Sequence, residues 1–225
     1  MVHAESVVIY GAGGQGRVVA DVLERWNGSY RIVGFVDDRS ELVGTLVAGY
    51  EVLGSIQDLG ARAEGQWHLI VAIGRNETRQ RLGDELTAAG VQFATAVHPS
   101  AQIGRDVTIG PGTVVMANAV INPGARIGAH VIVNTAATVD HDCVIEDFVH
   151  ISPGAHLTGN VAVGRGTLVG VGASVVPGVR IGSWTVVGAG AAVIHDLPDF
   201  VSAVGVPAVP VGDRPVARVG AEGGR

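Results

Sequence analysis

The chain has 225 residues, enough for one or two domains with a substantial core. Its formal net charge is −6 and no basic block occurs, which disfavours partners such as nucleic acid or an anionic membrane. Mean hydropathy is +0.37 and charged residues make up only 16%, a balance that favours large buried contacts between subunits.

The cysteine content and the apolar runs predict a cytoplasmic protein. Cys143 is the single cysteine, which excludes an intramolecular disulfide and suits a reducing compartment. We interpret Cys143 as a small buried hydrophobic residue rather than a nucleophile. We expect neither a signal peptide nor a membrane span, because no basic start precedes a long apolar run.

The first 95 residues alternate apolar runs with helical patterns, which predicts a parallel α/β sheet. We expect strands at 7–10, 31–36, 69–73 and 91–93, a loop at 41–49, and a short capped helix at 55–59. We expect longer helices at 17–26, with Val18, Val19, Val22 and Leu23 facing inward, and at 76–90, N-capped by Asn76 and stopped at Gly90.

A glycine motif, G-x-G-x-x-G, occupies residues 11–16 between the first strand and the first helix. The candidate phosphate donors are the backbone N–H groups of Gly13, Gly14, Gln15 and Gly16. Asp37 or Asp38, at the end of the second strand, would then meet a base or ribose. A dinucleotide fold needs two such halves and only one is present, so we expect a nucleotide-linked sugar rather than NAD. A purely structural tight turn is the alternative.

A ladder of aliphatic residues organises the rest of the chain. Every sixth residue from Ile103 to Val193 is Ile, Leu or Val, and Val97 extends the series. This period fits neither an amphipathic helix nor a long strand, and it is the hexapeptide β-helix repeat. Three hexapeptides form one coil, which predicts about five coils spaced about 4.8 Å apart. Glycine often follows the inward residue, and we attribute this to the backbone angles that corners need.

The histidines of this stretch suggest the chemistry. They are His130, His141, His150, His156 and His195. His141 can act as a general base near neutral pH, with Asp140 or Asp142 to orient it. One coil away on either side lie Pro123 and Gly159, which leave space for a ligand beside the imidazole. The alternative is a histidine at a solvated corner.

His150 lies half a coil after His141, so one chain holds the two on different sides of the prism. They can meet only if His150 comes from a neighbouring subunit. We therefore expect an oligomer with sites at its interfaces, and a triangular prism packs naturally as a trimer. Solvated corners are the alternative for both His150 and His156.

Several motifs together resemble one known family. They are GAGGQG, VDD, LIVAIGRNE, NTAATVDHDCVIEDFVHISPGAH and VGVPA. They look like the sialic-acid O-acetyltransferase and bacterial nucleotide-amino-sugar N-acetyltransferase family of left-handed β-helix acyltransferases. The resemblance implies a Rossmann-like nucleotide-sugar-binding domain at 1–95, a left-handed parallel β-helix at 96–196, and a C-terminal tail at 197–225. We expect the tail from residue 211 onward to be partly disordered.

The resemblance also implies roles for individual residues. It places the general base at His141 and its acidic partner at Asp142, where relatives often have Glu. Asn134 and His150 match polar positions near the acetyl group, and Gln15 stands where some relatives carry histidine. The positions that match the path of CoA are His150, Gly159, Val171, Gly172, Ala189 and Pro207.

We therefore expect a homotrimer that uses acetyl-CoA, with no metal and no NAD. The sugar C4 amine of a nucleotide-linked 4-amino-4,6-dideoxyhexose would attack the thioester directly, with no covalent acetyl-enzyme. The most similar subfamily uses GDP-perosamine, and UDP- and dTDP-sugars are alternatives. Three other functions stay open: sialic-acid O-acetylation, a zinc enzyme like the β-helix carbonic anhydrases, and a non-catalytic sugar-nucleotide sensor.

Overall fold

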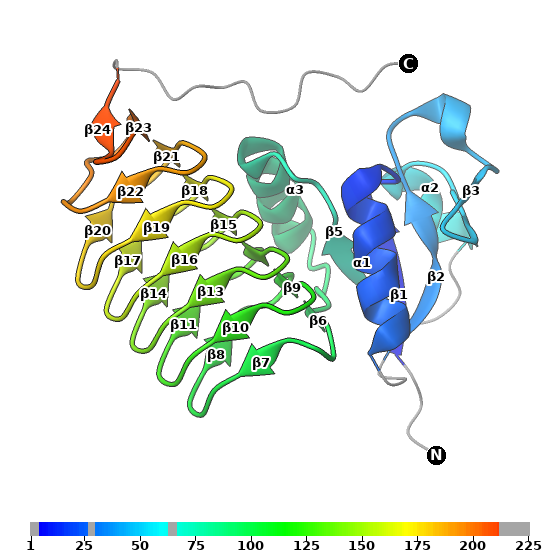
Figure 1. Cartoon of the computed structure of the whole chain (residues 1–225). Helices are drawn as coiled ribbons and strands as arrows, with labels where there is room; N and C mark the ends of the chain where they lie inside the picture. The colour runs from blue at the N-terminus through cyan, green and yellow to red at the C-terminus, as the bar shows by residue number, and fades with distance from the viewer. Residues whose placement is uncertain (1–4, 27–29, 63–66, 212–225) are drawn as a thin grey trace.

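The computed structural model describes residues 5–26, 30–62 and 67–211, with no side-chain account of 60–62. A small α/β unit, blue to teal in Figure 1, lies beside a parallel β-helix, green to red. In the described ranges we find no helix with the length and apolarity to cross a membrane. The partial disorder predicted from residue 211 onward falls on residues that lie outside the described part, apart from Val211.

The N-terminal unit is a three-stranded parallel sheet in the order β2–β1–β5. Its strands are β1 (Glu5–Tyr10), β2 (Tyr30–Val36) and β5 (Trp67–Val71). Its helices are α1 (Gly14–Arg25), α2 (Ile56–Arg62) and α3 (Asn76–Ala88). A 3-10 turn (Ser40–Leu42) and a small hairpin of β3 (Leu46–Val47) and β4 (Tyr50–Glu51) occupy the expected loop. The central strand β1 is buried on both faces, as a parallel sheet requires.

Three local expectations for this unit were wrong. Val18 is 42% exposed, because α1 begins at Gly14 and presents Val19, Ala20, Val22 and Leu23 to the core. Asn76 is the first residue of α3 rather than its N-cap, and its amide donates to Gly166 O of the β-helix at 2.9 Å. Phe93 makes a single bridge to Leu69 instead of a strand. The capped start of α2 is confirmed by the bonds of the Ser55 N–H and hydroxyl to Asp58 Oδ2.

The β-helix consists of short strands that begin every six residues. They are β6 (Ala96–Val97), β7 (Gln102–Ile103), β8 (Thr108–Ile109), β9 (Val114–Val115), β10 (Val120–Ile121), β11 (Arg126–Ile127), β12 (Ile132–Val133), β13 (Thr138–Val139), β14 (Val144–Ile145), β15 (His150–Ile151), β16 (His156–Leu157), β17 (Ala162–Val163), β18 (Leu168–Val169), β19 (Ser174–Val175), β20 (Arg180–Ile181), β21 (Val186–Val187) and β22 (Ala192–Val193). Each strand from β6 to β19 pairs with the third strand after it, so residues one coil apart are neighbours, as in Ile121, Val139 and Leu157.

Three parallel sheets form the sides of this prism. We call them the first side (β7, β10, β13, β16, β19, β22), the second side (β8, β11, β14, β17, β20) and the third side (β6, β9, β12, β15, β18, β21). The ladder residues from Val115 to Val193 point inward and are at most 3% exposed. Each such burial contributes roughly 1.5–3 kcal/mol. Ile103 is 40% exposed, because β7 pairs only with β10 at the open end of the first coil.

The corners of the prism have a regular backbone conformation that we had assigned to the wrong residue. One residue in each hexapeptide has a positive φ, without a gap from Asp106 to Gly190, and non-glycine examples include Asp142 and Phe148. The glycines that directly follow an inward residue have no such angle. A Cβ at Gly110 would lie 2.6 Å from the backbone N of Ala129 on the next coil. Those glycines are needed for close stacking of coils.

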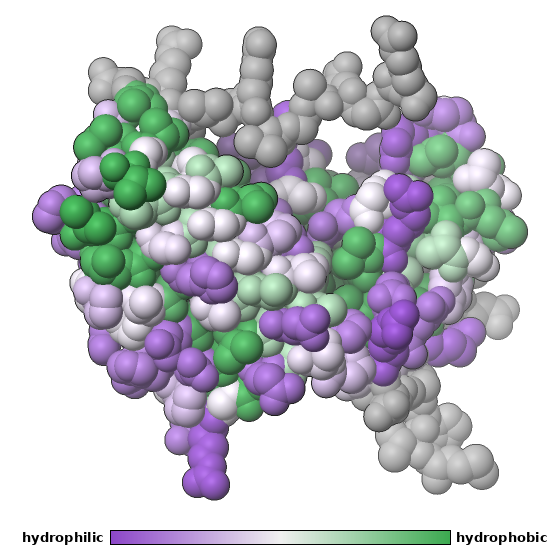
Figure 2. Space-filling model, viewed as in Figure 1, coloured by the Kyte–Doolittle hydropathy of each residue, from purple (hydrophilic) through white to green (hydrophobic). Residues whose placement is uncertain are grey.

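The residues after β22 continue the β-helix. Leu197 bridges to Ile181 and is 5% exposed. β23 (Ser202–Val204) adds to β21 on the third side, and β24 (Val209–Pro210) pairs with β23 antiparallel. Residues 197–211 thus form a last layer rather than a free tail. Apolar side chains gather at this end in Figure 2, and Val204, Val206 and Val209 are 41%, 77% and 54% exposed.

Candidate active site

His141 lies at the corner between β13 and β14, where the first side turns into the second. Its Nδ1 is 2.9 Å from Asp142 Oδ2. Its backbone N–H donates to Asp140 Oδ1 at 2.8 Å, and Asn122 Nδ2 donates to the same oxygen at 2.7 Å. Of the two acidic neighbours that the sequence left open, Asp142 therefore contacts the imidazole and Asp140 holds the backbone of the corner.

The two carboxylates also set the charge state of the corner. The hydrogen bond to Asp142 raises the pKa of His141, and the charge of Asp140 acts in the same direction. Hydrogen bonds from the His141 N–H and from Asn122 lower the pKa of Asp140. The His141 side chain is 53% exposed in the single chain. With Nδ1 held by Asp142, Nε2 is the nitrogen left to accept a proton from a substrate.

Two glycines make space for this pair. A Cβ at Gly159, one coil after His141, would lie 2.5 Å from both Cε1 and Nε2 of the imidazole. A Cβ at Gly124, one coil before Asp142, would lie 2.6 Å from Asp142 Oδ1. The imidazole therefore rests directly on the backbone of the next coil, and any side chain at residue 159 would displace it.

His150 lies on the third side, and Asn134 lies at the edge where the third side turns into the first, away from His141. Asn134 Nδ2 is 3.1 Å from His150 Nε2, and Asn134 Oδ1 accepts from the Thr135 N–H at 2.8 Å. The His150 ring also hydrogen-bonds the backbone of Gly74 in the N-terminal unit. Burial, with the charge of Arg79 adding to it, lowers the pKa of His150 to about 3. His150 is therefore neutral at working pH.

The residues matched to CoA fall on two edges of the prism. Gly159 shares the His141 edge. Val171 and Gly172 follow β18, and Ala189 follows β21 one coil later, so these residues lie on the edge between the third and first sides, as Asn134 does. Pro207 lies between β23 and β24 at the end of the β-helix. One chain thus carries the predicted site in two separate halves.

The glycine loop of the N-terminal unit has two kinds of glycine. Gly13 is the N-cap of α1, and a Cβ at Gly13 or Gly14 would meet nothing within 4 Å, so this backbone faces open space. Gly16 is different, because a Cβ there would collide with Gly11 O and the helix could not approach the strand. Gln15 Nε2 is buried without a partner among the described residues.

The two aspartates after β2 are already engaged. Asp37 accepts from the Ala12 N–H at 2.8 Å and from Arg39 Nε at 2.8 Å. Burial would raise the pKa of Asp37, but these hydrogen bonds from Arg39 and Ala12 outweigh it and lower the pKa. Asp38 accepts from the Tyr10 hydroxyl at 2.7 Å. The Asp37 carboxylate therefore shapes the start of the glycine loop from within the unit.

Sequence reasoning missed Arg79, which is 1% exposed in the seam between the two units. It shares one face of α3 with Leu82 and Leu86, which are buried at helical spacing. The sequence did contain a signal for this residue: an arginine stands at a helix position where the 3.6-residue period calls for an apolar side chain. Among the described residues no group of three or more His, Cys, Asp or Glu side chains is placed to hold a metal ion.

Comparison with known proteins supports this architecture. Residues 6–86 match the PglD N-terminal domain, and residues 97–135 match the bacterial transferase hexapeptide repeats. GDP-perosamine N-acetyltransferase of Escherichia coli O157:H7 is 32% identical over 73% of this chain and 75% of its own length. UDP-N-acetylbacillosamine N-acetyltransferase of Bacillus subtilis (strain 168) is 40% identical over 50% of this chain and 52% of its own length.

Solved structures match over nearly the whole fold. The acetyltransferase domain of PglB from Neisseria gonorrhoeae FA1090 has a TM-score of 0.85 and 39% identity, over 92% of this chain and 100% of that one. A histidine-to-asparagine mutant of perosamine N-acetyltransferase from Caulobacter crescentus, in complex with CoA and GDP-perosamine, has a TM-score of 0.86 and 42% identity, over 92% and 97%.

The fold and these matches define a hexapeptide-repeat acyltransferase with a small α/β domain followed by a left-handed parallel β-helix, which confirms the predicted fold class. The chain belongs to the family of bacterial nucleotide-amino-sugar N-acetyltransferases, which are enzymes that depend on acetyl-CoA.

Proposed function

We propose that this enzyme transfers acetyl from acetyl-CoA to the C4 amine of a nucleotide-linked 4-amino-4,6-dideoxyhexose, with GDP-perosamine as the first candidate. The observation that carries the mechanism is the imidazole of His141, bonded to Asp142 at 2.9 Å and resting on Gly159. The choice of sugar rests on the relatives from Escherichia coli and Caulobacter crescentus, whose names specify GDP-perosamine. UDP- and dTDP-linked sugars are the competing substrates.

In this mechanism the amine attacks the thioester carbonyl and His141 Nε2 accepts the amine proton. The new C–N bond forms, the C–S bond then breaks, and the proton passes to the departing CoA sulfur. Asp142 fixes the imidazole by its Nδ1 and stabilises the imidazolium, in accord with the raised pKa of His141. His150 Nε2 is paired with Asn134 Nδ2 at 3.1 Å, so a backbone N–H or the Asn134 amide N–H beside it is the candidate oxyanion donor.

The assembly we propose is a homotrimer in which each site joins two chains. His141 and Gly159 lie on one edge of the prism, and Asn134, Val171 and Ala189 lie on another. A neighbouring chain that brings its second edge against the first edge would complete the site. Exposed apolar side chains on both edges, Val176 and Ile194 on the first and Val171 on the second, support a covered surface of this kind.

An acetylation screen with GDP-, UDP- and dTDP-linked 4-amino sugars tests the substrate. We expect release of CoA thiol to be fastest with GDP-perosamine, and mass spectrometry should show an amide on C4. Fastest turnover with a UDP- or dTDP-sugar would reassign the base. An ester product would place the enzyme with the O-acetyltransferases, and release with none of these sugars would contradict the proposal.

His141→Asn tests the general base. We expect an unchanged circular dichroism spectrum and oligomer size, with kcat lower by about 10²- to 10⁴-fold. His195→Asn is the matched control, because His195 is exposed at the same corner three coils away. A variant at residue 141 that keeps near-normal kcat would exclude the assignment, and so would an equal loss in the control.

A further inference from the structure

Arg79 has the largest fully buried side chain among the described residues. Its five N–H groups have five oxygen partners: Nε donates to His130 O at 2.8 Å, Nη1 to Ile73 O at 2.9 Å and Gly74 O at 3.2 Å, and Nη2 to Asn76 Oδ1 at 2.9 Å and Phe148 O at 2.8 Å. Within the described residues no carboxylate lies at ion-pair distance from it.

An uncompensated buried cation is a poor way to stabilise a seam. Desolvation of the charge is costly, and an apolar side chain of similar size is often as good or better for the fold. Burial lowers the pKa of Arg79 to about 9, which reflects this cost. The guanidinium nevertheless offers a fixed planar set of donors, which holds backbone carbonyls in defined places. This points to positioning as its task.

The carbonyls that Arg79 holds belong to two parts of the molecule. Ile73 and Gly74 follow β5, at the carboxyl edge of the sheet where ligands of open α/β sheets bind. His130 and Phe148 are corner residues of successive coils, and the Asn76 amide reaches the third such corner at Gly166. Arg79 therefore fixes the Gly74 loop relative to the third side of the β-helix.

The Gly74 loop in turn contacts His150. The Gly74 backbone is a hydrogen-bond partner of the His150 ring, and Nε2 of this ring is 3.1 Å from Asn134 Nδ2. Because the ring is neutral, it donates to the Gly74 carbonyl and accepts from Asn134, a tautomer assigned from its partners. Asn134 Oδ1 is held by the Thr135 N–H, so one amide hydrogen of Asn134 stays free for a ligand.

We propose that Arg79 is a positioning residue for acetyl transfer, acting through the Gly74 carbonyl and His150 to orient the Asn134 amide at the acceptor site. The relay contains three side chains and one carbonyl, and it crosses from the nucleotide-binding unit to the β-helix. The role of Asn134 in this inference rests on the proposed function.

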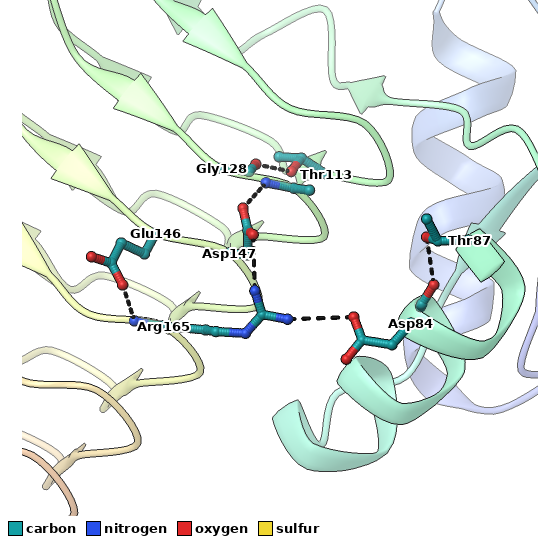
Figure 3. Close-up of polar contacts among 9 residues, drawn as sticks. Asp84, Thr87, Thr113, Gly128, Glu146, Asp147 and Arg165 are labelled. Atoms are coloured by element: carbon teal, nitrogen blue, oxygen red, sulfur yellow. Dashed lines mark hydrogen bonds and ion pairs between the residues drawn. The ribbon is translucent and has the colours of Figure 1, made fainter.

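A second contact between the same two units supplies the control. Arg165 lies on the β-helix and reaches Asp147 Oδ2 at 3.1 Å and Asp84 Oδ1 of α3 at 3.3 Å, as Figure 3 shows. Its guanidinium also lies 4.7 Å from the Phe148 ring centre. Arg165 therefore joins α3 to the β-helix without a bond to Gly74, His150 or Asn134.

The test compares Arg79→Met with Arg165→Met, using kcat and KM together with thermal unfolding. We expect Arg79→Met to lower kcat about 10- to 100-fold while KM for acetyl-CoA stays within about twofold, and Arg165→Met to leave kcat within about twofold. Arg79→Lys should recover part of the lost rate. Equal losses in both arginine variants, or an unchanged kcat in Arg79→Met, would overturn the proposal.

A double-mutant cycle separates positioning from general loosening. If Arg79 acts through Asn134, Arg79→Met adds little loss to Asn134→Ala, whereas independent effects multiply. Arg79→Lys replaces Arg79→Met in the same cycle should the latter not fold. The ¹⁵N signals of the His150 ring give a readout without turnover: one neutral tautomer in the wild type and a mixture in Arg79→Met. An unchanged tautomer overturns the relay even if the enzyme acetylates none of the sugars tested.

Discussion

The direction in which the Asp142 carboxylate points follows from the backbone conformation of this residue. Its φ of +58° is one that side chains other than glycine, asparagine and aspartate rarely adopt. Every hexapeptide needs such a residue at this point of the corner, so the repeat itself creates the place. An aspartate there turns back onto the preceding residue and reaches His141 Nδ1 at 2.9 Å. The aspartate side chain is therefore long enough to hold the imidazole.

Gly159→Ala isolates the space that the imidazole needs. The added Cβ would lie 2.5 Å from Cε1 and Nε2 of His141, and the ring must swing away from its present place. We expect kcat to fall at least about tenfold with little change in thermal stability, because the ring is exposed and can move into solvent. Pro177→Ala, at the same corner one coil later, is the control. Normal kinetics in Gly159→Ala would show that the observed ring position is not the working one.

At the residue scale, spacing predicted some of the site and not the rest. The period of six placed Gly159 beside His141, because stacking in a β-helix is fixed by residue number. The partner of the imidazole was left open between Asp140 and Asp142, since corner angles decide which carboxylate turns inward. Nothing in the local sequence could show that the Asp37 carboxylate already accepts hydrogen bonds from the Arg39 side chain and the Ala12 N–H.

Helix α3 connects the two halves of the molecule, between the sheet and the β-helix in Figure 1. Beside it the buried ring of His130 stacks on Phe148 at 5.0 Å between ring centres and meets Phe93 edge-on at 4.5 Å. His130 is 3% exposed, and its Nδ1 has no hydrogen-bond partner among the described residues. A charged imidazole here would be buried in an aromatic stack and close to Arg79.

This stack predicts a loss of stability in acid. Burial, followed by the charge of Arg79, lowers the pKa of His130 to about 4, against 6.5 for the free side chain. The unfolded chain therefore binds the proton first, and the contribution of the neutral ring is complete above pH 6.5 and is lost as pH falls toward 4. The loss amounts to about 3 kcal/mol for this one group.

His130→Phe removes that titration. Phenylalanine suits the site, because Phe148 occupies the equivalent corner one coil later with a φ of +59°. Urea unfolding at pH 7 and at pH 4.5 should show a smaller difference in the variant than in the wild type. An equal difference in both proteins would mean that His130 contributes nothing to the loss of stability in acid.

At the scale of elements, the repeat was far easier to predict than the sheet that precedes it. Strands of the β-helix recur at fixed positions because each hexapeptide repeats the same burial, so one pattern fixes all of them. In the N-terminal unit the first and last residue of each helix or strand depend on which of several hydrogen-bond partners the residues there take. Asn76 is an example, since its amide binds the Gly166 carbonyl and leaves the cap of α3 to Arg75.

The whole molecule places the predicted catalytic residues on separate edges of one prism. His141 lies between the first and second sides, and Asn134 and Val171 lie between the third and first sides. Sequence spacing predicted this separation from the half coil between His141 and His150. Spacing could not predict that the seam with α3 would engage His150 from within the same chain, because that contact depends on how the two units dock.

Mixing two inactive variants tests whether a site joins two chains. His141→Asn removes the base from one edge, and Asn134→Ala removes the amide from the other edge of the same prism. In a trimer assembled from both variants, some seams pair an intact His141 with an intact Asn134. Random assembly at equal amounts makes about one seam in four intact, so co-expression should recover about a quarter of wild-type activity. Each variant alone should stay at its low level, and the same two changes in a single chain should recover nothing when co-expressed with either. Mixed assemblies as inactive as the separate variants, with exchange of chains verified by tags, would place His141 and Asn134 in different sites or in one chain.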